Sequence, residues 1–327
     1  MIKHLNSKRK IFLACFILMI FSGIQSGAQM MPQLAPNFLE LPEKNFNFKF
    51  KWLGDSVNSR WEPNAYLLLP VKLPNCPRQF YMQFDLGSPS TIFYKSMLQQ
   101  IESRFPKVQN MEDSGSKLRK FNFRVGTIPV HATELTVMNY RSKNIDWSNE
   151  KGIDIIGTIG ADFIENRIMV LDYPARQFYN GISMRDKFAA RVALTDFMFP
   201  RRSVLLPAII RGKKLMLFYD TGSSAYQLLT DKKTSELMAA PRAMPIYSES
   251  RSWDKMRKMT TLATNDSIQI GSRTLPIRFT TFSEGASEAQ INQMMKLGIG
   301  GMTGNKLFVN SVLVIDTKNK KFGVITK

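Results

Sequence analysis

The chain has 327 residues, of which 44% are hydrophobic and 22% are charged. This composition is ordinary for a globular protein and excludes a collagen, a coiled coil or a wholly disordered chain. The 45 Lys and Arg residues exceed the 26 Asp and Glu residues by 19 positive charges, which favours contact with anionic partners without naming one.

Residues 1–28 have the features of a secretory signal. Four basic residues and no acidic residue lie in positions 1–10, an apolar run follows from Ile11 to Ile24, and Ser26-Gly27-Ala28 offers a small-x-small cleavage site. An uncleaved membrane anchor is the alternative, but the run is shorter than the roughly 20 residues that span a bilayer. We therefore predict a periplasmic or secreted protein of net charge +15, with no stable membrane span after cleavage.

Three segments are predicted to be irregular. Residues 29–45 contain three prolines and are expected to form the loose start of an N-terminal arm that covers 29–59. Residues 186–202 interrupt the apolar sequence with basic residues and are predicted to link two halves of the chain. The basic stretch Ser248–Lys258 is predicted to be a solvated loop.

Three elements recur in the same order in both halves of the chain. The first is an apolar strand that enters an Asp-x-Gly-Ser turn, over Phe80–Ser88 and over Leu215–Ser223. The second is a pair of alternating strands about a glycine, Gly126 in the first half and Gly271 in the second. The third is a Gly-x-x-Gly turn followed by a strand that ends in Asp.

The spacing of the third element is the same in both halves. The glycines that begin it, Gly157 and Gly301, are 144 residues apart, and so are the aspartates that end its strand, Asp172 and Asp316. The Asp-x-Gly turns are offset by 135 residues. A period this long is not that of a solenoid, so the duplication predicts paired lobes.

We predict a mainly β protein with lobes over 60–185 and 203–327, because its short apolar runs are rich in β-branched residues and bounded by turn residues. Helices are predicted only in three short stretches, Ser96–Glu102, Asp231–Met238 and Ser287–Lys296.

Cys and His are scarce, and after removal of residues 1–28 only Cys76 and His131 remain. A zinc site needs three or four protein ligands, which these two cannot supply. A Ser-His-Asp or Cys-His site would depend on His131, which lies in an alternating stretch typical of a strand. No Gly-rich phosphate loop occurs. We therefore expect no cofactor and no nucleic-acid partner, and we expect carboxylates to perform any acid–base chemistry.

The repeated turns place a carboxylate, Asp85 or Asp220, at the tip of a strand before a glycine. Such a turn points the acid out of the sheet. If the two lobes pack about an approximate two-fold axis, the acids meet and share one proton, so that the pair can activate water and protonate a leaving group. This chemistry cleaves an amide without metal, Cys or His.

The tripeptide pattern alone is weakly specific. Asp113-Ser114-Gly115-Ser116 also fits it, but charged and polar residues surround this segment, so we predict a plain turn there. Asp172 and Asp316 are predicted to be turn residues that close strands. A structural Asp-Gly turn remains the alternative for Asp85 and Asp220.

The segment Asp220-Thr221-Gly222-Ser223-Ser224, with the later Gly-x-x-Gly turn and strand, resembles the pepsin and retropepsin aspartic proteases. Residues 155–163 are similar to bacterial retropepsin-like domains. The resemblance covers about residues 60–180 and 203–325. It implies two lobes related by an approximate two-fold axis, each a closed or partly closed β-barrel, with the substrate peptide in the cleft between them.

By matching position, the resemblance implies that Asp85 and Asp220 are the catalytic pair in the turns of Gly87 and Gly222. It implies further support from three hydroxyl groups, which belong to Ser88, Thr221 and Ser223. Ser88 and Ser223 would buttress the two carboxylates, and Thr221 would supply its half of a hydroxyl clamp that links the turns.

The first turn departs from the family at Leu86, where the family has Thr or Ser. Leucine cannot donate the hydrogen bond, so the clamp is predicted to be one-sided. The leading hypothesis is an exported, monomeric aspartic endopeptidase that acts on a peptide or protein substrate. One alternative is an impaired relative that binds peptides in the cleft, and another is a basic surface that binds an anionic polymer or lipid with strong salt dependence.

Overall fold

The computed structural model describes residues 34–57, 60–108, 116–140, 142–184, 186–252, 255–284 and 298–326. The segment predicted as a secretory signal, the turn at Asp113–Gly115 and the helix predicted over Ser287–Lys296 lie outside the described residues. Strands dominate the described part, which confirms the prediction of a mainly β protein.

One eight-stranded sheet takes all its strands from residues 39–159. Its order is β1-β8-β6-β9-β5-β4-β3, and β7 pairs with β4 and β8. The strands are β1 (Leu39–Glu40), β3 (Lys51–Val57), β4 (Arg60–Lys72), β5 (Phe80–Phe84), β6 (Ile92–Tyr94), β7 (Lys117–Val125), β8 (Ile128–Met138) and β9 (Ile155–Ile159). Helix α2 (Lys95–Arg104) follows β6 and confirms the helix predicted over Ser96–Glu102.

Two further sheets come from residues 205–303. The first has the order β18-β17-β13-β14-β20 and the second the order β15-β16-β19. The strands are β13 (Leu205–Ile210), β14 (Lys213–Tyr219), β15 (Ile246–Ser252), β16 (Lys255–Ala263), β17 (Ser267–Ile270), β18 (Arg273–Pro276), β19 (Phe279–Ser283) and β20 (Ile299–Thr303). Helix α4 (Lys232–Met238) confirms the second predicted helix.

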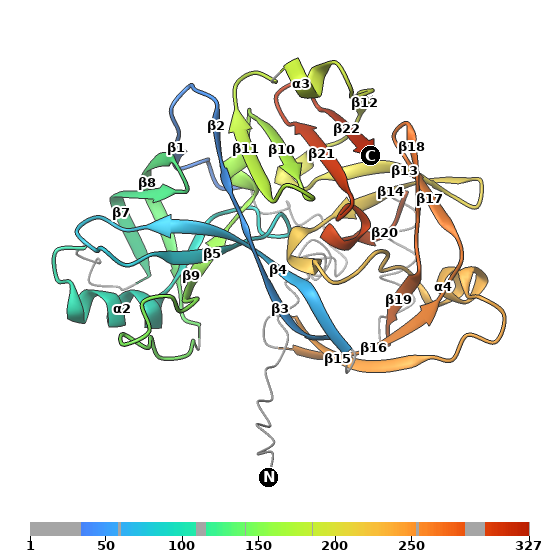
Figure 1. Cartoon of the computed structure of the whole chain (residues 1–327), viewed down its shortest axis with the longest axis horizontal. Helices are drawn as coiled ribbons and strands as arrows, with labels where there is room; N and C mark the ends of the chain where they lie inside the picture. The colour runs from blue at the N-terminus through green and yellow to red at the C-terminus, as the bar shows by residue number, and fades with distance from the viewer. Residues whose placement is uncertain are drawn as a thin grey trace, which may run out of the picture.

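A six-stranded sheet combines strands from both halves, in the order β12-β22-β21-β10-β11-β2, and Figure 1 shows it between the other two groups of strands. Its strands are β2 (Phe46–Lys49), β10 (Ile168–Asp172), β11 (Gln177–Gly181), β12 (Thr195–Asp196), β21 (Ser311–Asp316) and β22 (Lys321–Thr326). Short helices lie between the strands: η1 (Ala161–Ile164), α3 (Asp186–Ala189), η2 (Pro200–Arg202), η3 (Thr221–Ser223) and η4 (Asn305–Leu307). Strand β12, at the edge of this sheet, belongs to the segment predicted as the linker.

The N-terminal arm is not loose in its described part. Strand β1 pairs with β8, β2 with β11 and β3 with β4. The carbonyls of Pro42 and Lys44, between β1 and β2, accept hydrogen bonds from the buried Arg167 guanidinium at 3.1 and 2.9 Å. Pro36 and Pro42, the prolines in the described part of this segment, lie outside the strands, and Arg167 bonds to the irregular backbone at Pro42 and Lys44. The number of prolines was therefore a poor guide to the structure of the arm.

The basic stretch Ser248–Lys258 is also not a loop in its described part, which leaves out residues 253 and 254. It belongs to the β15–β16 hairpin, whose register runs from Ile246 opposite Thr261 to Ser252 opposite Lys255. The prediction failed because charged residues are compatible with a strand when they occupy an exposed face. Lys258 is exposed whereas Met259, next to it, is buried.

The recurring elements occupy corresponding places in the two halves. The strand before each Asp-x-Gly turn pairs in parallel with the strand of the Gly-x-x-Gly turn, β5 with β9 and β14 with β20. The second element forms a hairpin in each half, β7–β8 and β17–β18. The hairpins turn at Gly126 and Gly271, where φ is 57° and 56°.

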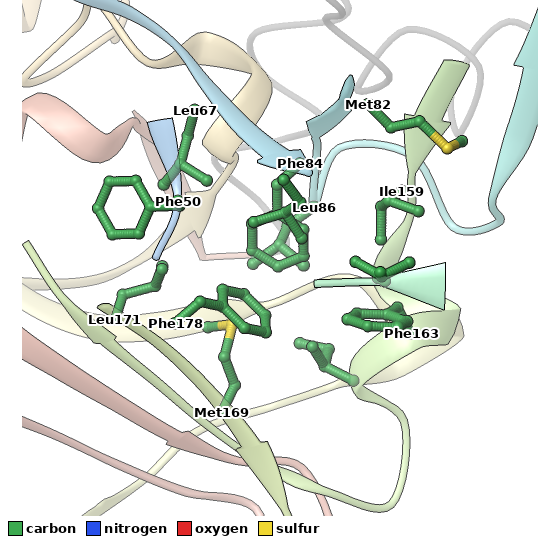
Figure 2. Close-up of a cluster of buried hydrophobic side chains, with 14 of the residues drawn as sticks. Phe50, Leu67, Met82, Phe84, Leu86, Ile159, Phe163, Met169, Leu171 and Phe178 are labelled. Atoms are coloured by element: carbon green, nitrogen blue, oxygen red, sulfur yellow. The ribbon is translucent and has the colours of Figure 1, made fainter. Parts of the chain in front are cut away.

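Alternation along β5 orients the residues near its end. Met82, Phe84 and Leu86 point into a buried cluster with Ile159 and Phe178 (Figure 2). Because side chains alternate between the faces of a strand, Gln83 and Asp85 point away from this cluster.

Candidate active site

The two Asp-x-Gly turns bring Asp85 and Asp220 together. Asp85 is 2% exposed and Asp220 is fully buried. The backbone N–H of Gly87 donates to Asp85 Oδ1 at 2.9 Å and to Asp220 Oδ1 at 3.1 Å. One N–H group therefore bridges the two carboxyl groups, which are adjacent although they are far apart in the sequence.

Each turn is held by the same backbone hydrogen bonds. The N–H of each aspartate donates to the neighbouring parallel strand, Asp85 to Ile159 O at 3.0 Å and Asp220 to Thr303 O at 2.9 Å. Each aspartate carbonyl then accepts from the N–H three residues later, at 3.1 Å in both turns. Each aspartate is thus fixed to a sheet by its N–H group and to its own turn by its carbonyl group.

The carboxyl groups pack over the glycines of the opposite turns. A Cβ atom on Gly87 would lie 2.7 Å from Asp220 Oδ1, and one on Gly222 would lie 2.5 Å from Asp85 Oδ1. Both distances are far below van der Waals contact. The glycines are therefore required by close approach of the carboxyl groups, whatever their backbone angles.

Besides the hydrogen bond from Gly87 N–H, Asp220 accepts hydrogen bonds from its own turn. The N–H of Gly222 donates to Oδ1 at 2.7 Å, and the hydroxyl of Ser223 donates to Oδ2 at 2.8 Å. The structure therefore brings Ser223 to the carboxyl group that it was predicted to support.

Burial raises the pKa of both aspartates, since the charged form loses its hydration. The charge of Asp220 and a hydrogen bond with it raise the pKa of Asp85 further. For Asp220, the hydrogen bonds from Asp85, Ser223 and Gly222 oppose the effect of burial. The arrangement favours a proton on Asp85 and a negative charge on Asp220.

The hydroxyl of Ser88 does not reach Asp85. It donates to the carbonyl of Ser90 at 2.7 Å, so the predicted buttress by this side chain is wrong. Pro89 lies between the two serines and fixes φ near −65°, whereas the second turn has Ser224 at the same place. The different backbone that follows Ser88 gives its hydroxyl a local acceptor.

Thr221 makes the half of the clamp that was assigned to it. Its Oγ1 accepts from the N–H of Leu86 at 2.9 Å and donates to the carbonyl of Phe84 at 2.8 Å. Leu86 offers no hydroxyl in return, and its side chain, 1% exposed, packs in the core of the first half (Figure 2).

A buried polar network behind the second turn was missed by the sequence analysis. Asn305 Nδ2 donates to Thr221 O and to Ser224 Oγ, both at 3.0 Å. Its Oδ1 accepts from the hydroxyls of Tyr173 at 2.6 Å and Tyr219 at 3.1 Å. In the sequence, this asparagine could have been singled out by its position directly after the second Gly-x-x-Gly turn.

Tyr94 was also missed. Its hydroxyl lies 3.0 Å from Thr158 Oγ1, and its ring stacks on Tyr140 with centroids 4.3 Å apart. Burial, with a contribution from the charge of Asp85, raises the pKa of Tyr94 to about 12. The phenol of Tyr94 therefore stays neutral at acidic to neutral pH.

The remaining aspartates singled out in the sequence serve as turn residues, as predicted. Asp172 accepts from the N–H of Ala175 at 3.1 Å, and Asp316 accepts from that of Asn319 at 2.9 Å. His131 is a strand residue, as predicted, and its Nδ1 lies 2.8 Å from Asn122 Oδ1.

Metal-site clusters and membrane-spanning helices are both absent from the described ranges. These ranges contain no group of three or more His, Cys, Asp or Glu side chains that could hold a metal ion. None of the helices that the structure describes is long and apolar enough to cross a membrane.

The chain has a distant structural likeness to solved proteins. An aspartic proteinase from Irpex lacteus matches with a TM-score of 0.49 and 12% sequence identity, over 86% of this chain and 97% of that chain. No protein-family model matches the chain, and no curated protein matches it.

The geometry supplies an acid and a base within one buried site. A carboxylate that is held ionised beside a protonated carboxyl group can take a proton from water while its partner gives one to a carbonyl oxygen. Burial strengthens these electrostatic interactions because little solvent screens them.

Proposed function

We propose that the protein is an aspartic endopeptidase that hydrolyses peptide bonds and needs no cofactor. The observation that carries the proposal is the bridge from Gly87 N–H to both Asp85 and Asp220. Two structural Asp-Gly turns would have no reason to bury their carboxyl groups against each other, because burial of like charges is costly.

In the proposed reaction, Asp220 accepts a proton from a water molecule held between the carboxyl groups. The water oxygen attacks the scissile carbonyl carbon, and Asp85 gives its proton to the carbonyl oxygen. The tetrahedral intermediate, a gem-diol, then collapses with cleavage of the C–N bond. The proton on Asp220 passes to the leaving nitrogen, and one gem-diol hydroxyl returns its proton to Asp85 as the C=O bond of the product acid forms, which restores the starting state of the pair. Hydrogen bonds from Ser223 and Gly222 favour ionised Asp220 as the base.

The test is digestion of a peptide mixture by the purified protein across acidic to neutral pH, with products identified by mass spectrometry. We expect cleavage by the wild type and a loss of at least about a thousandfold in Asp85→Asn and Asp220→Asn. Asp113→Asn is the matched control, because it makes the same exchange in the third Asp-x-Gly-Ser segment of the sequence. Cleavage that survives both dyad exchanges would exclude the mechanism.

A second candidate function is peptide binding without turnover, and the one-sided clamp at Leu86 favours it. A less firmly held first carboxyl group would lower the rate, since catalysis is sensitive to small displacements. Saturable binding of peptides by calorimetry, with no hydrolysis at any pH tested, would support this candidate over the first.

We also propose that the protein acts outside the cytoplasm, which the signal-like pattern of residues 1–28 supports. We propose in addition that it is monomeric. The test is N-terminal sequencing of protein recovered from the periplasm or medium of an expressing cell. We expect the mature chain to begin at Gln29 and to elute as a monomer in size-exclusion chromatography. An unprocessed chain retained in the cytoplasm would contradict this.

A further inference from the structure

Gln83, on the strand that leads into Asp85, has a buried amide nitrogen without a hydrogen-bond partner. The residue is 7% exposed, and its Nε2 is inaccessible to solvent and makes no hydrogen bond. Its neighbours Met82 and Phe84 point into the core (Figure 2), so Gln83 points to the opposite face, where Asp85 lies two residues further on.

The surroundings of Gln83 come from both halves of the chain. Leu68 of β4 and Thr158 of β9 are its partners in the sheet register, and such cross-strand partners share a face. The cluster that contains Leu68 also includes Ala225, from the end of the second Asp-x-Gly turn. Thr158 is the residue that contacts the Tyr94 hydroxyl. Gln83 therefore lies on the face of the sheet towards Asp85, next to side chains that connect it to both halves of the chain.

An amide in this position is unfavourable for the free protein. A buried donor without an acceptor loses its hydrogen bonds to water and gains none, and such groups are rare in native folds. Gln79, just before the same strand, shows the usual situation, since its Nε2 donates to the carbonyls of Val71 and Phe80 at 2.8 and 2.7 Å. The unpaired amide of Gln83 is explained if a ligand supplies its partner.

We propose that Gln83 determines specificity by pairing with a carboxamide side chain, Asn or Gln, next to the scissile bond. This inference rests on the proposed peptide-binding cleft, and it names the substrate class of that site. The two amides complement each other, because each offers N–H donors and a carbonyl acceptor. A substrate carboxylate would be disfavoured by the negative charge shared by Asp85 and Asp220, and an apolar side chain would leave Nε2 unpaired.

The experiment compares two peptides that differ at that position, one with Gln and one with the similarly sized Met. For the wild type, we expect at least about a tenfold higher kcat/KM for the Gln peptide, the effect of roughly one hydrogen bond. For Gln83→Met, we expect this preference to disappear or reverse. Affinities of both peptides for Asp85→Asn, measured by calorimetry, give a readout that does not need turnover.

The control is Gln79→Met, which removes two satisfied hydrogen bonds on the same strand segment. It should lower the melting temperature and leave the preference for Gln unchanged, whereas Gln83→Met should keep or raise the melting temperature.

The outcomes separate the two proposals. Cleavage without a Gln preference, or a preference that survives Gln83→Met, overturns the role of Gln83 and leaves the peptidase intact. Selective binding without cleavage overturns the peptidase and supports Gln83. If neither peptide is bound or cut, both proposals are wrong.

Discussion

The hydroxyl oxygen of Thr221 accepts the backbone hydrogen of Leu86 at 2.9 Å, across 135 positions of the chain. The same hydroxyl donates to Phe84 O, so one side chain satisfies two buried backbone groups of the opposite turn. The reciprocal bonds are missing because position 86 is leucine. The relative position of the two carboxyl groups therefore depends strongly on one hydroxyl.

Removal of this hydroxyl by Thr221→Val should destabilise the protein. The exchange preserves shape and leaves the N–H of Leu86 and the carbonyl of Phe84 buried without partners, at about 1–3 kcal/mol for each group. We expect the free energy of unfolding to fall by about 2–4 kcal/mol in urea titrations. Thr221→Ser keeps both bonds and should remain within about 1 kcal/mol of the wild type. Equal stability of the Val and Ser variants would show that the clamp contributes little.

Introduction of the second hydroxyl by Leu86→Thr should not stabilise the protein. The leucine side chain is buried in the core (Figure 2), and truncation of a buried leucine to alanine costs about 2–5 kcal/mol. A new hydrogen bond returns only about 1 kcal/mol, so we expect a net loss of about 2 kcal/mol in urea titrations. A gain in stability would indicate that the core readily closes around threonine.

The internal duplication allowed one part of the site, the pair of Asp85 and Asp220, to be predicted from the sequence. Asp85 and Asp220 stand at equivalent points of two repeated elements, and equivalent turns at the ends of strands were expected to meet. The one-sided clamp also followed from the sequence, because Leu86 carries no hydroxyl whatever its orientation.

Other features depend on contacts that no local pattern encodes. The Ser88 hydroxyl turns to Ser90, because the backbone after Ser88 differs from that of the second turn. Asn305 acts through tyrosines more than 80 positions away. Strands β1 and β2 were missed since their pairing partners, β8 and β11, lie far along the chain.

Ser223 should set the acidic limb of the pH profile. Its hydroxyl lowers the pKa of Asp220 by stabilising the ionised form. In Ser223→Ala the pKa of Asp220 rises, so the base loses its proton only at higher pH, and the rising limb of kcat/KM shifts to higher pH. A shift of about half to one pH unit is expected for one hydrogen bond. Ser88→Ala is the matched control and should leave the limb in place, since that hydroxyl bonds to Ser90 O. Equal shifts in both variants would contradict this assignment.

Asn305 should hold the second turn in position without touching the substrate. Asn305→Leu keeps the approximate volume but leaves the Thr221 carbonyl and the hydroxyls of Tyr173 and Tyr219 with fewer partners. We expect the free energy of unfolding to fall by about 2–4 kcal/mol and kcat to fall while KM stays nearly constant, because the displaced group is Asp220 rather than the substrate contacts. Tyr173→Phe removes a single donor to Asn305 Oδ1 and should cost about 1 kcal/mol. A variant of Asn305 that is destabilised but keeps the wild-type kcat would limit this network to a role in folding.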